Sequence, residues 1–225
     1  MFFNILRYMD VLKPKVVFLE NVKNLATHDR GLTFEVIQKK LKVRDYVICA
    51  KVLNAAHYSD VPQNRERIYI VCFKDAEIAE RFKFPERVDA TKKTVRSLLE
   101  TSVSDEFSYA KTKFYDRLKA EITDPGAVYQ WRRMYVRKNK SGLCPTLTAN
   151  MGTGGHNVPL VLDEKNGIRK LTPRECARLQ GFPDDYRFPE SLPNSVLYKQ
   201  IGNSVSVPVV RAIAEKIMKA LEGNG

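Results

Sequence analysis

The hydrophobic positions at the start of the chain predict a helix followed by a buried strand. Apolar side chains recur at helical spacing over residues 2–12, and Pro14 ends that helix. Residues 15–19 read Lys-Val-Val-Phe-Leu, a β-branched and aromatic run without polar alternation. Such a run is typical of a strand that is covered on both faces, as in a parallel α/β sheet.

The pattern continues with one more helix and two more strands. Apolar residues share one helical face between Phe34 and Leu41, and residues 46–53 and 67–73 have the composition of strands. Three buried strands do not make a closed α/β sheet, and the first has no evident second neighbour in the chain. The sequence therefore predicts an α/β fold with an incomplete sheet.

Periodicity weakens between residues 75 and 168 and returns afterwards. The middle segment has scattered charges and turn residues, which predicts a small, irregular, β-rich subdomain. Thr172-Pro-Arg-Glu175 is a capping box that opens a helix through Gln180, and an amphipathic helix is expected from about Ser206. We expect three parts: half of an α/β domain (1–74), the subdomain (75–168), and its end with a helix that returns to the α/β domain (169–225).

Charge narrows the kind of partner. The 225 residues include 38 Lys and Arg against 26 Asp and Glu, a formal net charge of +12. This excess favours a polyanion such as nucleic acid or an anionic membrane surface. No apolar run approaches the roughly 18 residues of a spanning helix, and the first residues do not resemble a signal peptide. We expect a soluble, cytoplasmic protein with no membrane segment.

The four cysteines are spread singly along the chain, at Cys49, Cys72, Cys144 and Cys176. Without a CxxC pair they predict neither a zinc site nor a disulfide framework. We expect reduced, mostly buried thiols and no metal site.

Glu20 follows a predicted buried strand directly. Ligands of open α/β sheets bind at the carboxyl ends of strands, so a carboxylate there is a candidate acid or base. A helix cap or an ordinary salt bridge is the alternative.

Two further clusters stand at the ends of predicted elements. In Gln63-Asn-Arg65-Glu-Arg67, alternation places the two arginines on one side of an extended segment, suited to a phosphate or a carboxylate. A solvated edge strand is the alternative there. Gly202-Asn-Ser-Val205 is expected to be a tight turn whose backbone N–H groups bind a ligand or merely cap the last helix.

Taken in order, four long segments resemble the DNA (cytosine-5)-methyltransferases. PKVVFLENVKNL is similar to the family's ENV motif, VLNAAHYSDVPQNRERIYIVCF to its QxRxR motif, IRKLTPRECARLQGFPDDYRF to its penultimate motif and YKQIGNSVSVPVVRAIAEKI to its final one. The likeness covers nearly the whole chain. It implies part of the family's doubly wound, Rossmann-like methyltransferase sheet, with residues 75–168 as a target-recognition domain.

The resemblance also implies catalytic and cofactor roles. It gives Glu20 the role of the acid at cytosine N3, and Arg67 that of the arginine that contacts O2 and holds the glutamate. Asn203, Ser204 and Val205 are similar to the segment that lines the S-adenosylmethionine pocket. The target base would have to be flipped out of the duplex to reach such a site.

Double-stranded DNA is the partner that the resemblance implies. Arg65 is expected on a backbone phosphate with Gln63 beside it, and Thr146 begins a Thr-Leu pair like that of the family's recognition domains. Gly152 and Gly154 would let the backbone approach DNA closely. Residues 131–140 interleave cations with aromatic rings, which suits phosphate contacts with some stacking, although a solvated basic face is the alternative. The contacts expected from this segment are Arg132, Arg133, Arg137 and Lys138.

Motifs of the family's first half have no counterpart in the chain. There is no FxGxG turn for S-adenosylmethionine, no acidic residue for its ribose, and no Pro-Cys loop, whose thiolate is the family's nucleophile. We therefore expect the C-terminal subunit or fragment of a restriction-modification type methyltransferase, inactive without an N-terminal half. The alternatives are a non-catalytic DNA-binding remnant and, because one branch of the family acts on tRNA, an RNA methyltransferase.

Overall fold

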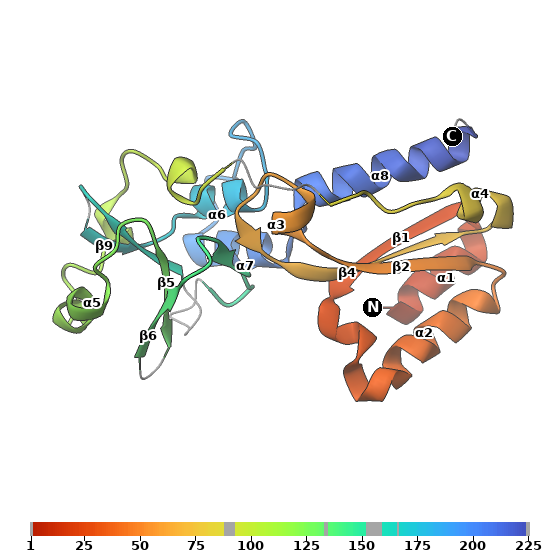
Figure 1. Cartoon of the computed structure of the whole chain (residues 1–225), viewed down its shortest axis with the longest axis horizontal. Helices are drawn as coiled ribbons and strands as arrows, with labels where there is room; N and C mark the ends of the chain where they lie inside the picture. The colour runs from red at the N-terminus through yellow and green to blue at the C-terminus, as the bar shows by residue number, and fades with distance from the viewer. Residues whose placement is uncertain (1, 88–92, 133–134, 152–158, 166, 224–225) are drawn as a thin grey trace. The chain divides into compact units, whose positions relative to one another are not determined.

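In the computed structural model, the three strands predicted near the N-terminus form one sheet in the order β1-β4-β2. β1 spans Val16–Val22, β2 spans Val47–Asn54 and β4 spans Glu66–Phe73. The central strand β4 is antiparallel to both neighbours, whereas the sequence favoured a parallel sheet. The strands are nevertheless apolar for the reason that the sequence indicated, because helices cover both faces of the sheet (Figure 1).

The structure describes residues 2–87, 93–132, 135–151, 159–165 and 167–223, and the chain divides into two compact units. Unit 1 comprises Met1–Asn54, Glu66–Arg87 and Val209–Gly225; unit 2 comprises Ala55–Arg65 and Val88–Pro208. These bounds differ from the expected division at residues 74 and 168. Residues 55–65 join unit 2, and so does the segment from 169 to 208.

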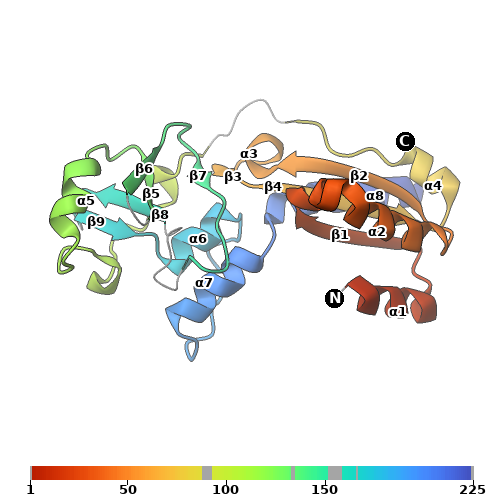
Figure 2. The same ribbon diagram turned by 90° about the horizontal axis from the view of Figure 1, so that it is seen from below.

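Unit 1 is a three-layered α/β structure. Helices α1 (Phe2–Leu12) and α2 (Leu32–Lys42) cover one face of the sheet and α8 (Val207–Glu222) covers the other, with α4 (Ala76–Arg81) beside α8 (Figures 1 and 2). Two short 3-10 turns, Lys23–Ala26 and His28–Gly31, connect β1 to α2. The layer under α1 and α2 is a cluster of apolar side chains that includes Leu6, Met9, Ile37, Leu41, Ile68, Ile70 and Cys72.

β1 lies at one edge of this sheet. Among the described residues it pairs with β4 alone, from Val16 opposite Phe73 to Val22 opposite Arg67. An apolar strand with one open edge agrees with the prediction of an incomplete sheet.

Unit 2 is built on an antiparallel sheet in the order β6-β5-β8-β9, which confirms the β-rich character predicted for the middle of the chain. Its strands are β5 (Val128–Arg132), β6 (Tyr135–Asn139), β8 (Pro159–Asp163) and β9 (Gly167–Lys170). A short parallel pair joins β3 (Gln63–Asn64) to β7 (Cys144–Pro145). The helical elements are α3 (Ala55–Tyr58), η3 (Arg96–Leu98), η4 (Asp105–Phe107), α5 (Tyr115–Glu121), α6 (Pro173–Leu179) and α7 (Asn194–Asn203).

The predicted capping box is present and belongs to a buried charge network. The Glu175 N–H donates to Thr172 Oγ1 at 3.1 Å, and the Thr172 N–H donates to Glu175 Oε2 at 2.8 Å. Arg169 donates to both oxygens of Glu175, at 2.9 and 2.8 Å, and to Asp163 at 3.0 Å. The side chains of Arg169 and Glu175 are 0% exposed, so each charge depends on the other.

No helix in the described part of the chain is long and apolar enough to span a membrane.

We expect Arg169→Met to lower the free energy of unfolding of unit 2 by about 3–5 kcal/mol, because it leaves two carboxylates facing an apolar side chain. The fluorescence of Trp131, the only tryptophan and a residue of β5, reports this unit in urea titrations. Lys111→Met is the control, since it removes an exposed ion pair with Asp105 and should cost less than about 1 kcal/mol. Equal effects of the two substitutions would contradict the buried network.

Candidate catalytic pair and basic groove

Glu20 and Arg67 form an ion pair on neighbouring strands of unit 1. Glu20 is opposite Tyr69 and Arg67 is opposite Val22, so the two charged residues are diagonal neighbours on one face of the sheet. Arg67 Nε lies 3.0 Å from Glu20 Oε1, and the side chains are 13% and 24% exposed. The guanidinium therefore orients a carboxyl group that remains partly accessible.

The adjacent ion pair is of a different kind. Glu66 precedes Arg67 in β4, so its side chain points to the opposite face of the sheet. Its carboxylate pairs with Lys23 at 2.5 Å. Those side chains are 40% and 51% exposed, so water screens the pair more strongly. At the end of β1, Asn21 Oδ1 accepts the Val22 N–H at 2.8 Å, which folds its side chain back onto the strand. Of these two neighbouring pairs, Glu20–Arg67 is the more buried.

Arg65 occupies a different environment from Arg67. It is 3% exposed, and its guanidinium donates to the carbonyl oxygens of Leu147 at 2.9 Å, Gly202 at 3.3 Å and Ser204 at 2.5 Å. The chain passes from unit 2 to unit 1 between Arg65 and Arg67, so the two arginines belong to different units. As folded, Arg65 offers no surface to a phosphate. Its charge instead holds two segments of unit 2 together.

The Gln63 side chain is also buried inside unit 2 and is not available at a surface for DNA. It is 0% exposed; its Nε2 donates to Leu179 O at 2.7 Å and its Oε1 accepts the Leu147 N–H at 3.2 Å. Gln180, at the end of α6, donates to Ile201 O at 3.1 Å. Gln63 and Arg65 thus connect the Thr146-Leu147 loop to the ends of α6 and α7.

The segment expected to be a tight turn is the end of a helix. α7 continues through Asn203, and Ser204 is its C-cap, with Oγ donating to Ile201 O at 2.7 Å. A Cβ atom on Gly202 would lie 2.3 Å from the carbonyl of Thr148, so this close approach requires glycine. Asn203 is exposed, and Ser204 and Val205 are half-buried, which leaves all three within reach of a ligand.

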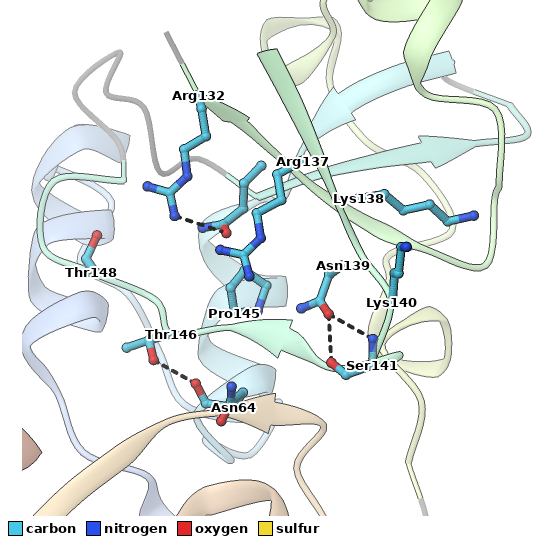
Figure 3. Close-up of a pocket in the computed structure, with 11 residues that line it drawn as sticks. Asn64, Arg132, Arg137, Lys138, Asn139, Lys140, Ser141, Pro145, Thr146 and Thr148 are labelled. Carbon is cyan, nitrogen blue, oxygen red and sulfur yellow. Dashed lines mark hydrogen bonds between the residues drawn. The ribbon is translucent and has the colours of Figure 1, made fainter. Parts of the chain in front are cut away.

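Unit 2 also contains a groove of about 740 Å³ with one basic wall (Figure 3). One wall is the β5–β6 hairpin and the segment after it, and the other is the loop that holds Thr146. Thr146 Oγ1 donates to Asn64 O at 2.6 Å, which fixes that loop against β3. None of the eleven described lining residues is acidic. The hairpin side contributes Gln130, Arg132, Arg137, Lys138, Asn139, Lys140 and Ser141, and the loop side Asn64, Pro145, Thr146 and Thr148.

The strand register separates the basic residues into two sets. Gln130 is opposite Arg137, and Arg132 lies two residues beyond Gln130, so these side chains share one face of the hairpin. Lys138 is opposite Tyr129 on the other face. Its Nζ lies 2.8 Å from Asp124 Oδ2, and this hydrogen bond raises the pKa of Lys138 and lowers that of Asp124. Figure 3 shows the Lys138 side chain extending away from Arg132 and Arg137.

Sequence reasoning grouped the cations of residues 131–140 without this distinction and missed Gln130 altogether. Period-two alternation across the segment would have separated Arg137 from Lys138. Three of the expected contacts, Arg133, Gly152 and Gly154, lie outside the described residues.

Burial makes all four thiols poor nucleophiles. It raises the pKa of Cys72 to about 12 and also raises the pKa values of Cys49, Cys144 and Cys176. Cys144 lies in β7 and not in a loop as expected, and it is 0% exposed. The described residues also contain no group of three or more His, Cys, Asp or Glu side chains that could hold a metal ion.

A family model described as C-5 cytosine-specific DNA methylase matches residues 1–219. This chain belongs to that family. The methylase is 53% identical over 225 residues to the Type II methyltransferase M.Bsp6I of Bacillus sp. (strain RFL6), covering 98% of this chain and 70% of that relative. It is 38% identical to M.SsoII of Shigella sonnei, covering 99% of this chain and 58% of that relative.

Solved structures support the fold of the methylase. The S. pombe Dnmt2 methyltransferase has a TM-score of 0.68 at 18% identity, with 100% of this chain and 72% of that chain covered. The Entamoeba histolytica methyltransferase EhMeth has a TM-score of 0.69 at 17% identity, with 92% and 63% covered. The sheet of unit 1 is therefore part of a Rossmann-like methyltransferase fold, as the sequence predicted.

We expect Arg65→Met to lower the free energy of unfolding of unit 2 by about 3 kcal/mol, because two buried carbonyls and one part-buried carbonyl lose a charged donor. Trp131 fluorescence in urea measures the loss. Arg67→Met removes a guanidinium from unit 1 and should leave that transition in place. A transition unmoved by Arg65→Met would contradict the buried role of this residue.

We expect Cys72, Cys144 and Cys176 of the native protein to resist a thiolate-specific disulfide reagent at pH 8, because burial disfavours the charged thiolate. They should react once urea unfolds the chain. The half-buried Cys49 should react slowly before unfolding. Rapid modification of Cys144 in the native state, located by peptide mass spectrometry, would contradict this assignment.

Proposed function

We propose that this chain supplies the cytosine-protonating and DNA-recognising parts of a restriction-modification type DNA (cytosine-5)-methyltransferase. The observation that carries the proposal is the partly buried Glu20–Arg67 ion pair at 3.0 Å, formed by the two motifs that the family resemblance assigns to cytosine. The substrate is double-stranded DNA in the bacterial cytoplasm, and the target base is flipped out of the stack.

The chemistry explains why such a pair is needed. Cytosine C5 is a poor nucleophile until a thiolate adds to C6, and that addition pushes negative charge into the ring. A carboxylic acid at N3 relieves this charge by donating a proton or a charge-assisted hydrogen bond. Glu20 is the acid, and Arg67 holds its carboxyl group in one orientation while presenting its remaining N–H groups to cytosine O2.

The basic groove of unit 2 is the DNA-binding part of the proposal. Arg132, Arg137 and Lys140 line it without any described carboxylate, which favours contact with a polyanion. Lys138 contributes less, because Asp124 already neutralises its charge. Thr146, fixed by its hydrogen bond to Asn64, stands at the opposite wall.

S-adenosylmethionine is the methyl donor of this family, and the chain carries only part of a site for it. Asn203 is exposed and Ser204 and Val205 are half-buried at the end of α7, which fits a segment that contacts a ligand. Arg65 fixes this segment by donating a hydrogen bond to the Ser204 carbonyl oxygen. When bound, the donor supplies an electrophilic methyl group on a sulfonium.

The nucleophile and the rest of the donor pocket come from a second polypeptide or an N-terminal half in this proposal. No cysteine in the chain follows a proline, and burial disfavours the thiolate form of all four. The open edge of β1 is the place where the strands of such a half would extend the sheet. The alternative, a non-catalytic DNA-binding remnant, rests on the same lack of a reactive thiol.

We expect the isolated chain to transfer no labelled methyl group to duplex DNA. Activity should appear when it is mixed with the part of the Bacillus sp. (strain RFL6) relative that it does not cover. In this mixture Glu20→Gln should lower the methylation rate by about 100-fold or more, because an amide cannot donate the proton that the ring needs. Glu66→Gln, which alters only the exposed pair with Lys23, is the matched control.

Methyl transfer by the isolated chain would overturn its dependence on a second half. Equal losses from Glu20→Gln and Glu66→Gln would overturn the role of the ion pair. Salt-dependent binding of duplex DNA that never leads to methylation, whatever half is added, would favour the remnant.

A further inference from the structure

The groove face of the β5–β6 hairpin carries two arginines in a defined arrangement. Arg137 lies opposite Gln130 in the strand register, and Arg132 lies two residues beyond Gln130 on the same face. The guanidinium of Arg137 makes no hydrogen bond or ion pair with any residue that the structure describes. Figure 3 shows both side chains reaching toward the loop that holds Thr146 and Thr148.

Gln130 restrains one of these guanidiniums. Arg132 donates from its terminal nitrogen to Gln130 Oε1 at 3.4 Å, a long hydrogen bond (Figure 3). Gln130 is only 7% exposed, so its amide is held by its surroundings. Such a restraint holds the planar guanidinium in one orientation, as recognition of a specific partner requires.

From this arrangement we propose that Arg132 and Arg137 each read one guanine in the major groove of the target DNA, and that Gln130 positions Arg132. The inference rests on the proposed DNA binding and goes beyond it by naming the bases. Guanine O6 and N7 are two acceptors side by side, which match the guanidinium fork, whereas other base edges do not. β8 pairs with β5 only as far as Gln130, so the β5–β6 hairpin continues beyond it as a two-stranded ribbon, which is narrow enough to enter the major groove.

The geometry also limits how far apart the two guanines lie. Arg137 and Arg132 are diagonal neighbours across the strand pair, and such positions are about 7–8 Å apart. Successive bases along a DNA strand rise by about 3.4 Å. The guanines therefore lie about two base pairs apart, on the same strand or on opposite strands.

Phosphate binding is the competing role for these arginines, and the groove argues against it. A phosphate contact needs only an exposed cation, and Arg137 and Lys140 are both exposed. Arg132 and Gln130 are recessed, and amide side chains of Gln130, Asn139 and Asn64 lie around the arginines. Amides and guanidiniums together are the groups that recognise base edges.

The test is a selection of bound sequences from a random duplex library by the full 225-residue chain. Wild-type protein should enrich sites with two guanines about two base pairs apart. Arg137→Met should weaken binding to the selected site about ten-fold and allow any base at one of the two positions. Arg132→Met should relax the other position, and Gln130→Ala should relax that same position to a smaller extent.

Two controls separate base reading from charge. Lys138→Met removes a cation from the next residue of β6, on the opposite face, and should keep both guanines in the selected sites. Arg137→Lys keeps the charge but not the fork, so it should preserve binding to random duplexes and weaken one guanine preference.

Three results would overturn the inference. If Arg137→Met and Lys138→Met weaken selected and random duplexes alike, the arginine binds phosphate. Salt-dependent binding without any enriched guanine would leave the proposed DNA binding standing and reject the base readers. A chain that binds no duplex at all would reject both.

Discussion

One wall of the basic groove and the end of α7 depend on the buried guanidinium of Arg65. Arg65 carries a positive charge at 3% exposure, and such a charge is tolerated only where acceptors surround it. The acceptors are backbone carbonyls from two distant segments, the Thr146-Leu147 loop and the end of α7. Gln63 adds hydrogen bonds to the same loop and to the end of α6. One wall of the basic groove and the segment from Asn203 to Val205 are consequently held by the same short stretch of chain.

This arrangement changes the meaning of the QNRER segment. Its three long polar side chains look equivalent in the sequence, yet Gln63 and Arg65 organise unit 2 and Arg67 orients a carboxyl group in unit 1. Close packing at Gly202 also holds the end of α7 against the loop of unit 2, since a Cβ there would clash with the backbone of Thr148. In the proposed function, the segment thus serves both the recognition of DNA and the protonation of cytosine.

Much of the fold could be predicted where local patterns decide it. The helix over residues 2–12, the three apolar strands and the Thr172–Glu175 capping box all follow from periodicity or cap chemistry. Strand direction could not, because a strand buried between helices is apolar whether its neighbours are parallel or antiparallel. Among the site residues, the position of Glu20 near the end of β1 was predictable, although the strand continues two residues further, to Val22. The burial of Arg65 was not, since its acceptors come from Leu147, Gly202 and Ser204, more than eighty residues away.

The central claim is that the chain holds the acid for cytosine and the readers of DNA but not the nucleophile. A duplex with 5-fluorocytosine at the target position tests it directly, because fluorine at C5 cannot leave as a proton does and the thiolate stays bonded to C6. The duplex is mixed with this chain, S-adenosylmethionine and the complementing part of the Bacillus relative, and the covalent complex is identified by mass spectrometry. The account predicts DNA bonded to the complementing polypeptide alone. DNA bonded to Cys49, Cys72, Cys144 or Cys176 would contradict it.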